Sequence, residues 1–250
     1  MKTARTWKNG LMIAIMAGLL LAGAMPAWGT NITATLTADN DYILYYGTAN
    51  GSSLTQVGTG SDWTTATTYN FNVPAGEYLY VLAWNDLSSS APQGNPQAWV
   101  GQFTGYLPGG GTLLSNLSQW QSIFTTSGNP SIGYPVPIVA QVQALILGGG
   151  WAASTPVPYS TGSYPYFFGN STPNGGPNIW TANAGAISGI STSADWIWFD
   201  NFSYYSASEN GFAIFRPDTA AVPLPPSVLL LGSGLVGLGG LGWRRNRKSA

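Results

Sequence analysis

Apolar and polar residues alternate along much of this chain. Across Asn31–Ala38, the apolar residues Ile32, Ala34 and Leu36 alternate with threonines, which is the period-two pattern of a strand with one buried face. Other runs of strand length, each bounded by turn-forming residues, are Tyr42–Gly47, Leu54–Val57, Thr64–Val73, Glu77–Trp84, Trp99–Tyr106, Asp195–Phe199 and Gly211–Arg216. The run Glu77–Trp84 is nearly continuous in bulky residues, so we expect it to lie in the interior of a sheet. Short strands at this spacing predict a mainly β domain, built as an antiparallel β-sandwich.

Three other segments lack this alternation. Apolar residues recur at helical spacing between residues 112 and 124, so we predict one short amphipathic helix over Thr112–Phe124. The apolar run Ile138–Leu147 has the length of a strand and is predicted to be one. The stretch Gly148–Pro177, rich in Gly, Pro and Ser, is predicted to be a long loop.

Tryptophans inside the predicted strands are expected in the core, because packing is the commonest role of such rings. This group comprises Trp84, Trp99, Trp196 and Trp198. Trp196 and Trp198 are two positions apart, so a continuous strand would place them on the same face of a sheet.

Residues 1–29 have the three parts of a secretory signal peptide. Lys2, Arg5 and Lys8 precede the apolar run Leu11–Ala24, and small residues stand three positions and one position before a cleavage point at Thr30. An uncleaved N-terminal anchor is the alternative. The short apolar run and the small residues after it favour cleavage.

The predicted folded body, residues 30–221, is followed by a second tripartite segment, residues 222–250. Its proline motif consists of Val222, Pro223, Leu224, Pro225 and Pro226. The uncharged run Ser227–Trp243 would form a helix about 25 Å long, enough to cross a thin bilayer. We expect the basic tail after it to remain cytoplasmic. That tail contains Arg244, Arg245, Arg247 and Lys248.

This layout resembles the PEP-CTERM sorting signal of bacterial exosortase substrates. The resemblance implies export, transient anchoring in the inner membrane, processing by an exosortase-like enzyme, and delivery to the cell surface or an extracellular polymer. Leu224 stands where the commonest motif, V-P-E-P, has glutamate, so the segment is closer to the VPLPA-type subclass. An ordinary C-terminal transmembrane tail that is not processed is the alternative.

The charge and composition of the body narrow its function. Between Thr30 and Ala221, one cation, Arg216, stands against nine carboxylates, which gives a formal charge of −8. Such a body cannot neutralise a phosphate backbone, so we exclude nucleic acid as a partner. The chain contains no histidine and no cysteine, so it lacks the commonest general base, the commonest metal ligand and all thiol chemistry.

The body resembles, more weakly, the galactose-binding-like jelly roll of secreted carbohydrate-active proteins. The resemblance covers about half of the body and is carried by T-A-D-N-D-Y-I-L-Y-Y-G at residues 37–47, by V-P-A-G-E-Y-L-Y-V-L-A-W-N-D at residues 73–86 and by G-F-A-I-F-R at residues 211–216. It implies a jelly-roll-like sandwich. Because a shared fold does not imply a shared ligand, it does not identify one.

Two groups of polar residues have alternative interpretations. The oxygen ligands Asp39, Asn40 and Asp41 would suit Ca²⁺, but a turn whose side chains bond their own backbone is favoured. Asp195, Asp200 and Asn201 are interpreted in the same way. The carboxylates Glu77, Asp86 and Asp200 could supply an acid and a base for glycoside hydrolysis, but no spacing pairs them, so we do not predict an enzyme.

Aromatic residues in or beside the Gly/Pro-rich stretch are the candidate glycan-binding residues, because sugar rings stack on exposed aromatic faces. These are Trp151, Tyr159, Tyr164, Tyr166 and Trp180. We therefore expect an exported surface or extracellular-matrix protein with a structural or adhesive role. A carbohydrate-binding module, with extracellular polysaccharide as its partner, is the first alternative, and a secreted glycan-active enzyme is the second.

Overall fold

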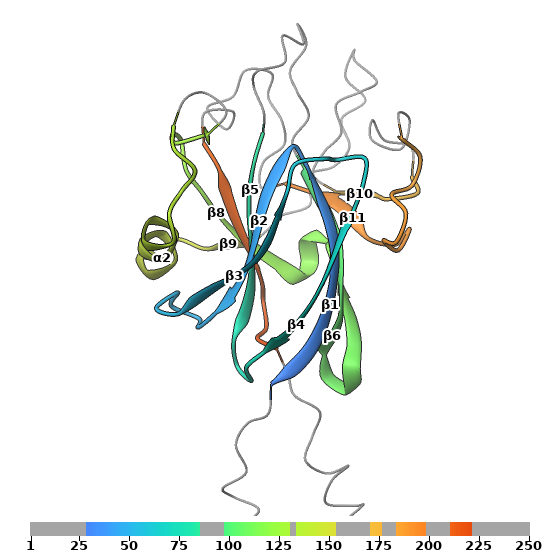
Figure 1. Cartoon of the computed structure of the whole chain (residues 1–250), viewed down its shortest axis with the longest axis horizontal. Coiled ribbons are helices and arrows are strands. Elements are labelled where there is room, and N and C mark those ends of the chain that lie inside the picture. Colours follow the sequence, from blue (N-terminus) through green and yellow to red (C-terminus); the bar gives the residue numbers. More distant parts are fainter. Residues whose placement is uncertain are drawn as a thin grey trace, which may run out of the picture.

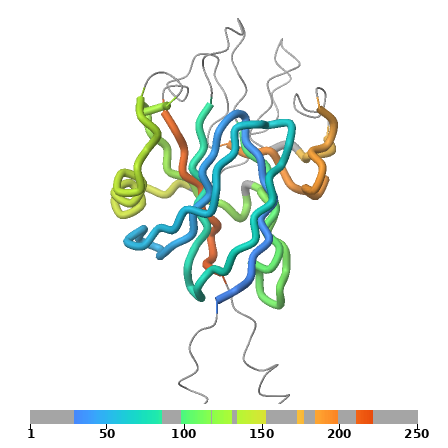
Figure 2. Tube along the Cα trace, viewed as in Figure 1, coloured from blue at the N-terminus to red at the C-terminus, as the bar shows by residue number. Residues whose placement is uncertain are grey.

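The computed structural model describes residues 29–85, 98–130, 134–153, 171–176, 184–198 and 211–221. These residues form two antiparallel sheets and a short helix, α2 (Figures 1 and 2). The predicted signal peptide, apart from Gly29, and the segment 222–250 lie outside the described residues. Within the part of the chain that is described, no helix is both long and apolar enough to span a membrane.

The first sheet has the strand order β10-β11-β6-β1-β4, and β7 also pairs with β6. Its strands are β1 (Thr30–Asp39), β4 (Thr67–Val73), β6 (Ala98–Leu107), β7 (Gly111–Leu114), β10 (Ser171–Pro173) and β11 (Asp195–Ile197). A short 3₁₀ helix, η1 (Pro108–Gly110), turns the chain from β6 into β7.

The second sheet has the strand order β3-β2-β5-β12-β8-β9. Its strands are β2 (Asp41–Gly47), β3 (Leu54–Gly60), β5 (Tyr78–Trp84), β8 (Trp120–Phe124), β9 (Ala152–Ala153) and β12 (Ala213–Pro217). As predicted from its nearly continuous apolar sequence, β5 is an interior strand, paired with β2 on one side and with β12 on the other. The predicted class, mainly β with antiparallel sheets and one short helix, is confirmed.

The two sheets share a core in a sandwich-like arrangement. Ile32, Leu36 and Trp99 from the first sheet belong to the same buried cluster as Val81 and Phe215 from the second. Trp99 stands edge-on to Trp120, with ring centroids 4.7 Å apart, and its ring centroid lies 5.7 Å from that of Phe215. Edge-to-face pairs of this kind add to the apolar burial that joins the sheets.

The outward face of each sheet is also partly covered. On the second sheet, Tyr80, Leu82 and Ile214 pack with Val142 and Ile146 of α2 (Val139–Gly148). On the first sheet, residues 187–194 cover the start of β6 and form a third cluster with Trp196. Because the second sheet is covered on its inner face by the first sheet and on its outer face by α2, the residues of β5 that point to either face are apolar.

The prediction of a helix over Thr112–Phe124 is wrong. The segment contains β7, the 3₁₀ helix η2 (Leu117–Gln119) and β8. Ser115 fixes the chain between β7 and η2, because its N–H donates to the Gly101 carbonyl at 2.9 Å and its hydroxyl donates to the Asp195 carbonyl at 2.7 Å. Pairing with β6 and β12 outweighs an apolar spacing that is interspersed with weak helix formers.

The prediction of a strand over Ile138–Leu147 is also wrong, because α2 occupies this segment. Val142 and Ile146, four residues apart, are the buried positions of the helix. The Gln141 side chain accepts the Ile138 N–H at 3.0 Å, which satisfies a free amide at the helix start. Gly149, with φ of 72°, ends the helix and donates its N–H to the Ile146 carbonyl at 3.2 Å.

All four tryptophans predicted in the core are buried, but Trp196 and Trp198 do not share a face. Trp196 packs in the outer cluster of the first sheet, whereas Ile197 and Trp198 belong to the central core. Strand β11 ends at Ile197, so the two-residue period no longer holds at Trp198. The predicted loop Gly148–Pro177 contains the short strands β9 and β10; its residues 154–170 lie outside the described part.

Candidate functional site

Trp151, a candidate glycan-binding residue, lies half-buried just after α2. The Arg216 guanidinium carbon lies 4.0 Å from the centroid of its ring, and the Tyr80 ring lies 6.2 Å from it at a tilt of 41°. One face of Trp151 is therefore covered by a cation from its own chain. A sugar could stack only on the part of the ring that Arg216 and Tyr80 leave uncovered.

Arg216 joins three parts of the second sheet. Its Nη1 donates to the Ala49 carbonyl at 3.0 Å, in the turn between β2 and β3, and its Nη2 donates to Gln121 Oε1 on β8 at 3.3 Å. The guanidinium carbon also lies 5.2 Å from the Tyr78 ring centroid. These contacts make Arg216 a structural link, and they use both terminal nitrogens of the guanidinium, while its Nε is buried.

Tyr80 also stabilises the turn between β2 and β3. Its hydroxyl donates to the Thr48 carbonyl at 2.6 Å. Burial raises the pKa of Tyr80 to about 12, and the nearby Arg216 acts against this rise. The phenol is therefore neutral at physiological pH and serves as a fixed donor.

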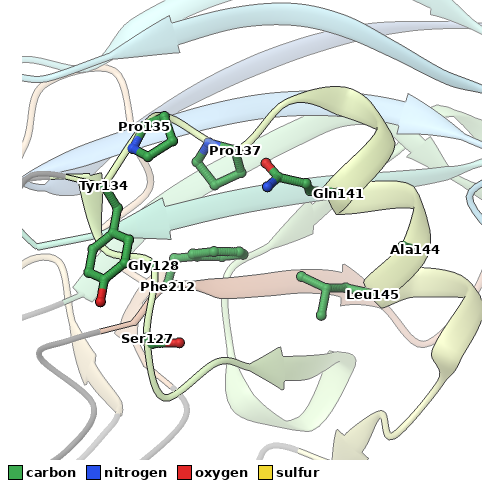
Figure 3. Close-up of a pocket in the computed structure, with 9 residues that line it drawn as sticks. All are labelled: Ser127, Gly128, Tyr134, Pro135, Pro137, Gln141, Ala144, Leu145 and Phe212. Atoms are coloured by element: carbon green, nitrogen blue, oxygen red, sulfur yellow. The ribbon is translucent and has the colours of Figure 1, made fainter.

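A pocket of about 360 Å³ opens between α2 and the turn that follows β8 (Figure 3). Nine of the described residues line it: Ser127, Gly128, Tyr134, Pro135, Pro137, Gln141, Ala144, Leu145 and Phe212. The Phe212 ring lies between the two sides, with Pro135 and Pro137 above it and Ser127 below. The volume is in the range of small-ligand sites.

Hydrogen bonds around Thr125 hold the lower side of this pocket. Phe212 precedes β12 and is 6% exposed. Its N–H donates to Thr125 Oγ1 at 3.0 Å and its carbonyl accepts the Thr125 N–H at 3.0 Å, so it is held against the turn after β8. The Thr125 hydroxyl donates to the Ser127 carbonyl at 2.9 Å. The lower side of the pocket is therefore fixed before any ligand arrives.

The pocket lining is chemically neutral. None of the nine residues is acidic, basic, histidine or cysteine. The side-chain hydrogen-bonding groups are the hydroxyls of Ser127 and Tyr134 and the amide of Gln141. Apolar walls with a few polar groups can bind and orient a ligand, but this lining offers no acid–base pair for catalysis.

The Asp39–Asp41 segment crosses from β1 to β2, and therefore from one sheet to the other. The Asp39–Asn40 peptide bond is cis, and the Asn40 N–H donates to the Trp84 carbonyl at 3.3 Å. Among the described residues, no three His, Cys, Asp or Glu side chains gather to hold a metal ion. A Ca²⁺ ion here would need main-chain oxygens in addition to the Asp39, Asn40 and Asp41 side chains, and Ca²⁺ binding stays the untested alternative to the favoured turn.

Glu77 lies at the start of β5, at the opposite end of the sandwich from the pocket. Burial raises the pKa of its carboxyl group. Its main chain joins the Pro74 turn to Ala221 through hydrogen bonds of 3.1 and 2.8 Å. Asp86 and Asp200, which sequence reasoning considered with Glu77, lie outside the described residues.

Of the five candidate glycan-binding aromatics, Trp151 alone lies among the described residues. Tyr159, Tyr164, Tyr166 and Trp180 lie outside the described residues, as do the sorting-motif residues. Sequence reasoning missed the pocket altogether. Pro135 and Pro137 before the helix were the one available signal, since alternating prolines mark a rigid extended entry.

Comparison of the chain with known proteins gives no relative from which a function could be transferred. No protein-family model, no curated protein and no solved structure matches the chain.

Proposed function

We propose that this is an exported bacterial protein, sorted by an exosortase-type system, that acts structurally or as an adhesin at the cell surface or in the extracellular matrix. In this proposal, residues 1–29 are a cleaved signal peptide and residues 30–221 form a jelly-roll-like sandwich. Residues 222–250 are a sorting segment with a transmembrane helix over 227–243.

The position of the two ends of the body is the observation that carries this proposal. Thr30 pairs with Val73 at the end of β4. Ala221, the residue before the proline motif, donates its N–H to the Glu77 carbonyl at 2.8 Å and accepts the Gly76 N–H at 3.2 Å. Both ends of the body therefore lie at the turn between β4 and β5, at the bottom of Figure 1.

The opposite end of the body carries the pocket. Strand β12 runs from the pocket residue Phe212 toward Ala221, and its five residues alone span about 17 Å. A membrane anchor that follows Ala221 would hold the β4–β5 turn toward the membrane and leave the pocket end free. This is the orientation that an adhesive surface protein needs.

The order of the strands supports the jelly-roll part of the proposal. The chain changes sheet between β1 and β2, β3 and β4, β4 and β5, and β5 and β6. As a result β1 pairs with β4 and β6, and β2 pairs with β5, across long separations in sequence. Such nested pairing between two sheets is typical of jelly rolls.

Replacement of Arg244, Arg245, Arg247 and Lys248 with Ser tests the sorting proposal in a host that encodes the exosortase. We expect the variant to be lost from the surface fraction, because the positive charge that keeps the tail cytoplasmic is gone. The matched control replaces the three arginines with Lys, which keeps the charge and should keep the location. Unchanged surface delivery of the Ser variant, measured by cell fractionation, would overturn the proposal.

A further inference from the structure

We infer that the pocket between α2 and the turn after β8 binds one residue of a neutral polysaccharide, a hexose that carries a methyl-bearing substituent such as an acetamido or 6-deoxy group. This deepens the adhesive role proposed above and rests on it. The pocket itself is observed independently of export, so its ligand can be tested independently too.

The absence of charge selects the neutral class of ligand. No acidic or basic residue occurs in the sequence from residue 87 to residue 194, which includes all of the lining except Phe212. A uronate or a sulfated sugar would bring a negative charge with no cation to meet it. Arg216 does not line the pocket, and its guanidinium is already bonded to Ala49 and Gln121.

The polar groups suit a few hydroxyls rather than an apolar ligand alone. Gln141 Oε1 accepts the Ile138 N–H at 3.0 Å, which fixes which side of the amide is the acceptor and leaves its NH₂ group as a donor. Figure 3 shows this amide on the upper side of the pocket and Ser127 on the lower side. A ring with hydroxyls at opposite edges could reach both.

The apolar lining sets the substituent. Leu145, Ala144, Pro137 and Phe212 present no hydrogen-bonding side chain. A hexose with a hydroxyl at every carbon would leave at least one of them unpaired against this wall, which is costly. A methyl group in that position would instead gain from burial.

Tyr134 extends the site beyond the pocket, toward the next unit of a polymer. Its side chain is 48% exposed at the rim. The neighbouring Val136 and Ile138 are 49% and 63% exposed, so the rim continues as an apolar surface. Exposed apolar surface beside a pocket is typical of a binding region.

The test measures binding of methyl glycosides to the full chain, purified in detergent, by titration calorimetry or saturation-transfer NMR. We expect the N-acetylglucosaminide or the 6-deoxyhexoside to bind at least about fivefold tighter than the glucoside, and the glucuronide not to bind. Equal binding of all neutral glycosides, preference for the glucuronide, preference for the apolar probe p-cresol, or no binding at all would overturn the inference.

Two substitutions on one helix localise the effect. Ala144→Trp fills the pocket and should abolish binding, whereas Leu147→Trp adds the same ring at a position that is 70% exposed and outside the lining, and should leave it unchanged. Tyr134→Ala should weaken binding of a disaccharide about fivefold, in the range of one aromatic contact. Equal loss in both Trp variants would overturn the inference. Correct surface delivery of Ala144→Trp, measured by fractionation, would show that binding and sorting fail separately.

Discussion

Arg216 is the single cation of the body, and its guanidinium contacts other residues of the same chain. It stacks on Trp151, lies near Tyr78 and bonds the turn between β2 and β3 as well as β8. Within the described part of the chain, this one residue joins the hairpin, the segment after α2 and the centre of the second sheet. A lysine could not reproduce these contacts, because they depend on a planar fork of donors.

We predict that Trp151→Leu and Arg216→Gln are coupled. Each should lower the free energy of unfolding, and a double-mutant cycle should give a coupling of about 1 kcal/mol, the usual size of a half-exposed cation–π contact. Urea denaturation of the four proteins measures it. Strictly additive effects would mean that the stacking contributes nothing and that only the hydrogen bonds of Arg216 stabilise the sheet.

The same residue shows what the sequence could not reveal about Trp151, whose glycan binding stays a prediction. Trp151 was singled out because it stands in a Gly-rich stretch, where burial is less assured than in a strand. The sequence shows the tryptophan but not the arginine 65 residues later that folds onto it. Conversely, Phe212 was assigned to a strand, and nothing local indicates that α2 and Ser127 would enclose a pocket around it.

At the scale of elements, most of the strands were predictable and the helix was not. Runs of strand length bounded by turn residues located β1, β2, β3, β4, β5, β6, β11 and β12. Two segments without period-two alternation were given the wrong type of structure. Thr112–Phe124 was predicted to be a helix and contains strands, whereas Ile138–Leu147 was predicted to be a strand and is occupied by α2. Their local patterns are ambiguous, because a short apolar run fits either structure. Tertiary contacts determine which structure each segment adopts. The first segment pairs with β6, and α2 packs on the second sheet.

Helix α2 is held by two buried side chains, by one close contact and by a hydrogen bond from the Gln143 amide to the Ser52 carbonyl at 3.3 Å. Val142 and Ile146 pack on the second sheet, and a Cβ atom on Gly51 would lie 2.9 Å from Ile146. The turn between β2 and β3 therefore rests directly on the helix. The rest of α2 carries no charge, so its attachment depends on these contacts rather than on ion pairs.

We predict that Ile146→Ala lowers the free energy of unfolding by about 3 kcal/mol, because it leaves a cavity between α2 and the second sheet. The adjacent Leu147→Ala serves as the control, since Leu147 is 70% exposed and its truncation should change stability by less than about 0.5 kcal/mol. Urea denaturation measures both. Similar effects for the two variants would contradict the burial of Ile146.

At the scale of the whole molecule, the fold separates two ends. The β4–β5 turn meets both ends of the body, Thr30 and Ala221. The turn after β8 and the pocket lie at the other end of β12. A single short sandwich can therefore be tethered at one end and make contacts at the other, without a second domain to act as a spacer.

This geometry can be measured in membranes because the chain has no cysteine, so any cysteine introduced is a unique label. We predict that a fluorophore attached through Ala75→Cys, in the β4–β5 turn, is strongly quenched by quencher-bearing lipid head groups when the unprocessed full chain is reconstituted in vesicles. A fluorophore attached through Thr126→Cys, after β8, should be little quenched, because at least the length of β12, about 17 Å, separates it from the tethered end.

The comparison between the two labels is what decides the orientation. Removal of residues 222–250 should abolish quenching at both positions, because the proposed anchor that holds the body at the bilayer is then gone. Equal quenching of the two labels in the full chain would mean that the body lies flat on the membrane. Stronger quenching at Thr126→Cys would mean that the pocket faces the lipid, and either result would contradict a body held by its β4–β5 end with its pocket exposed to the surroundings.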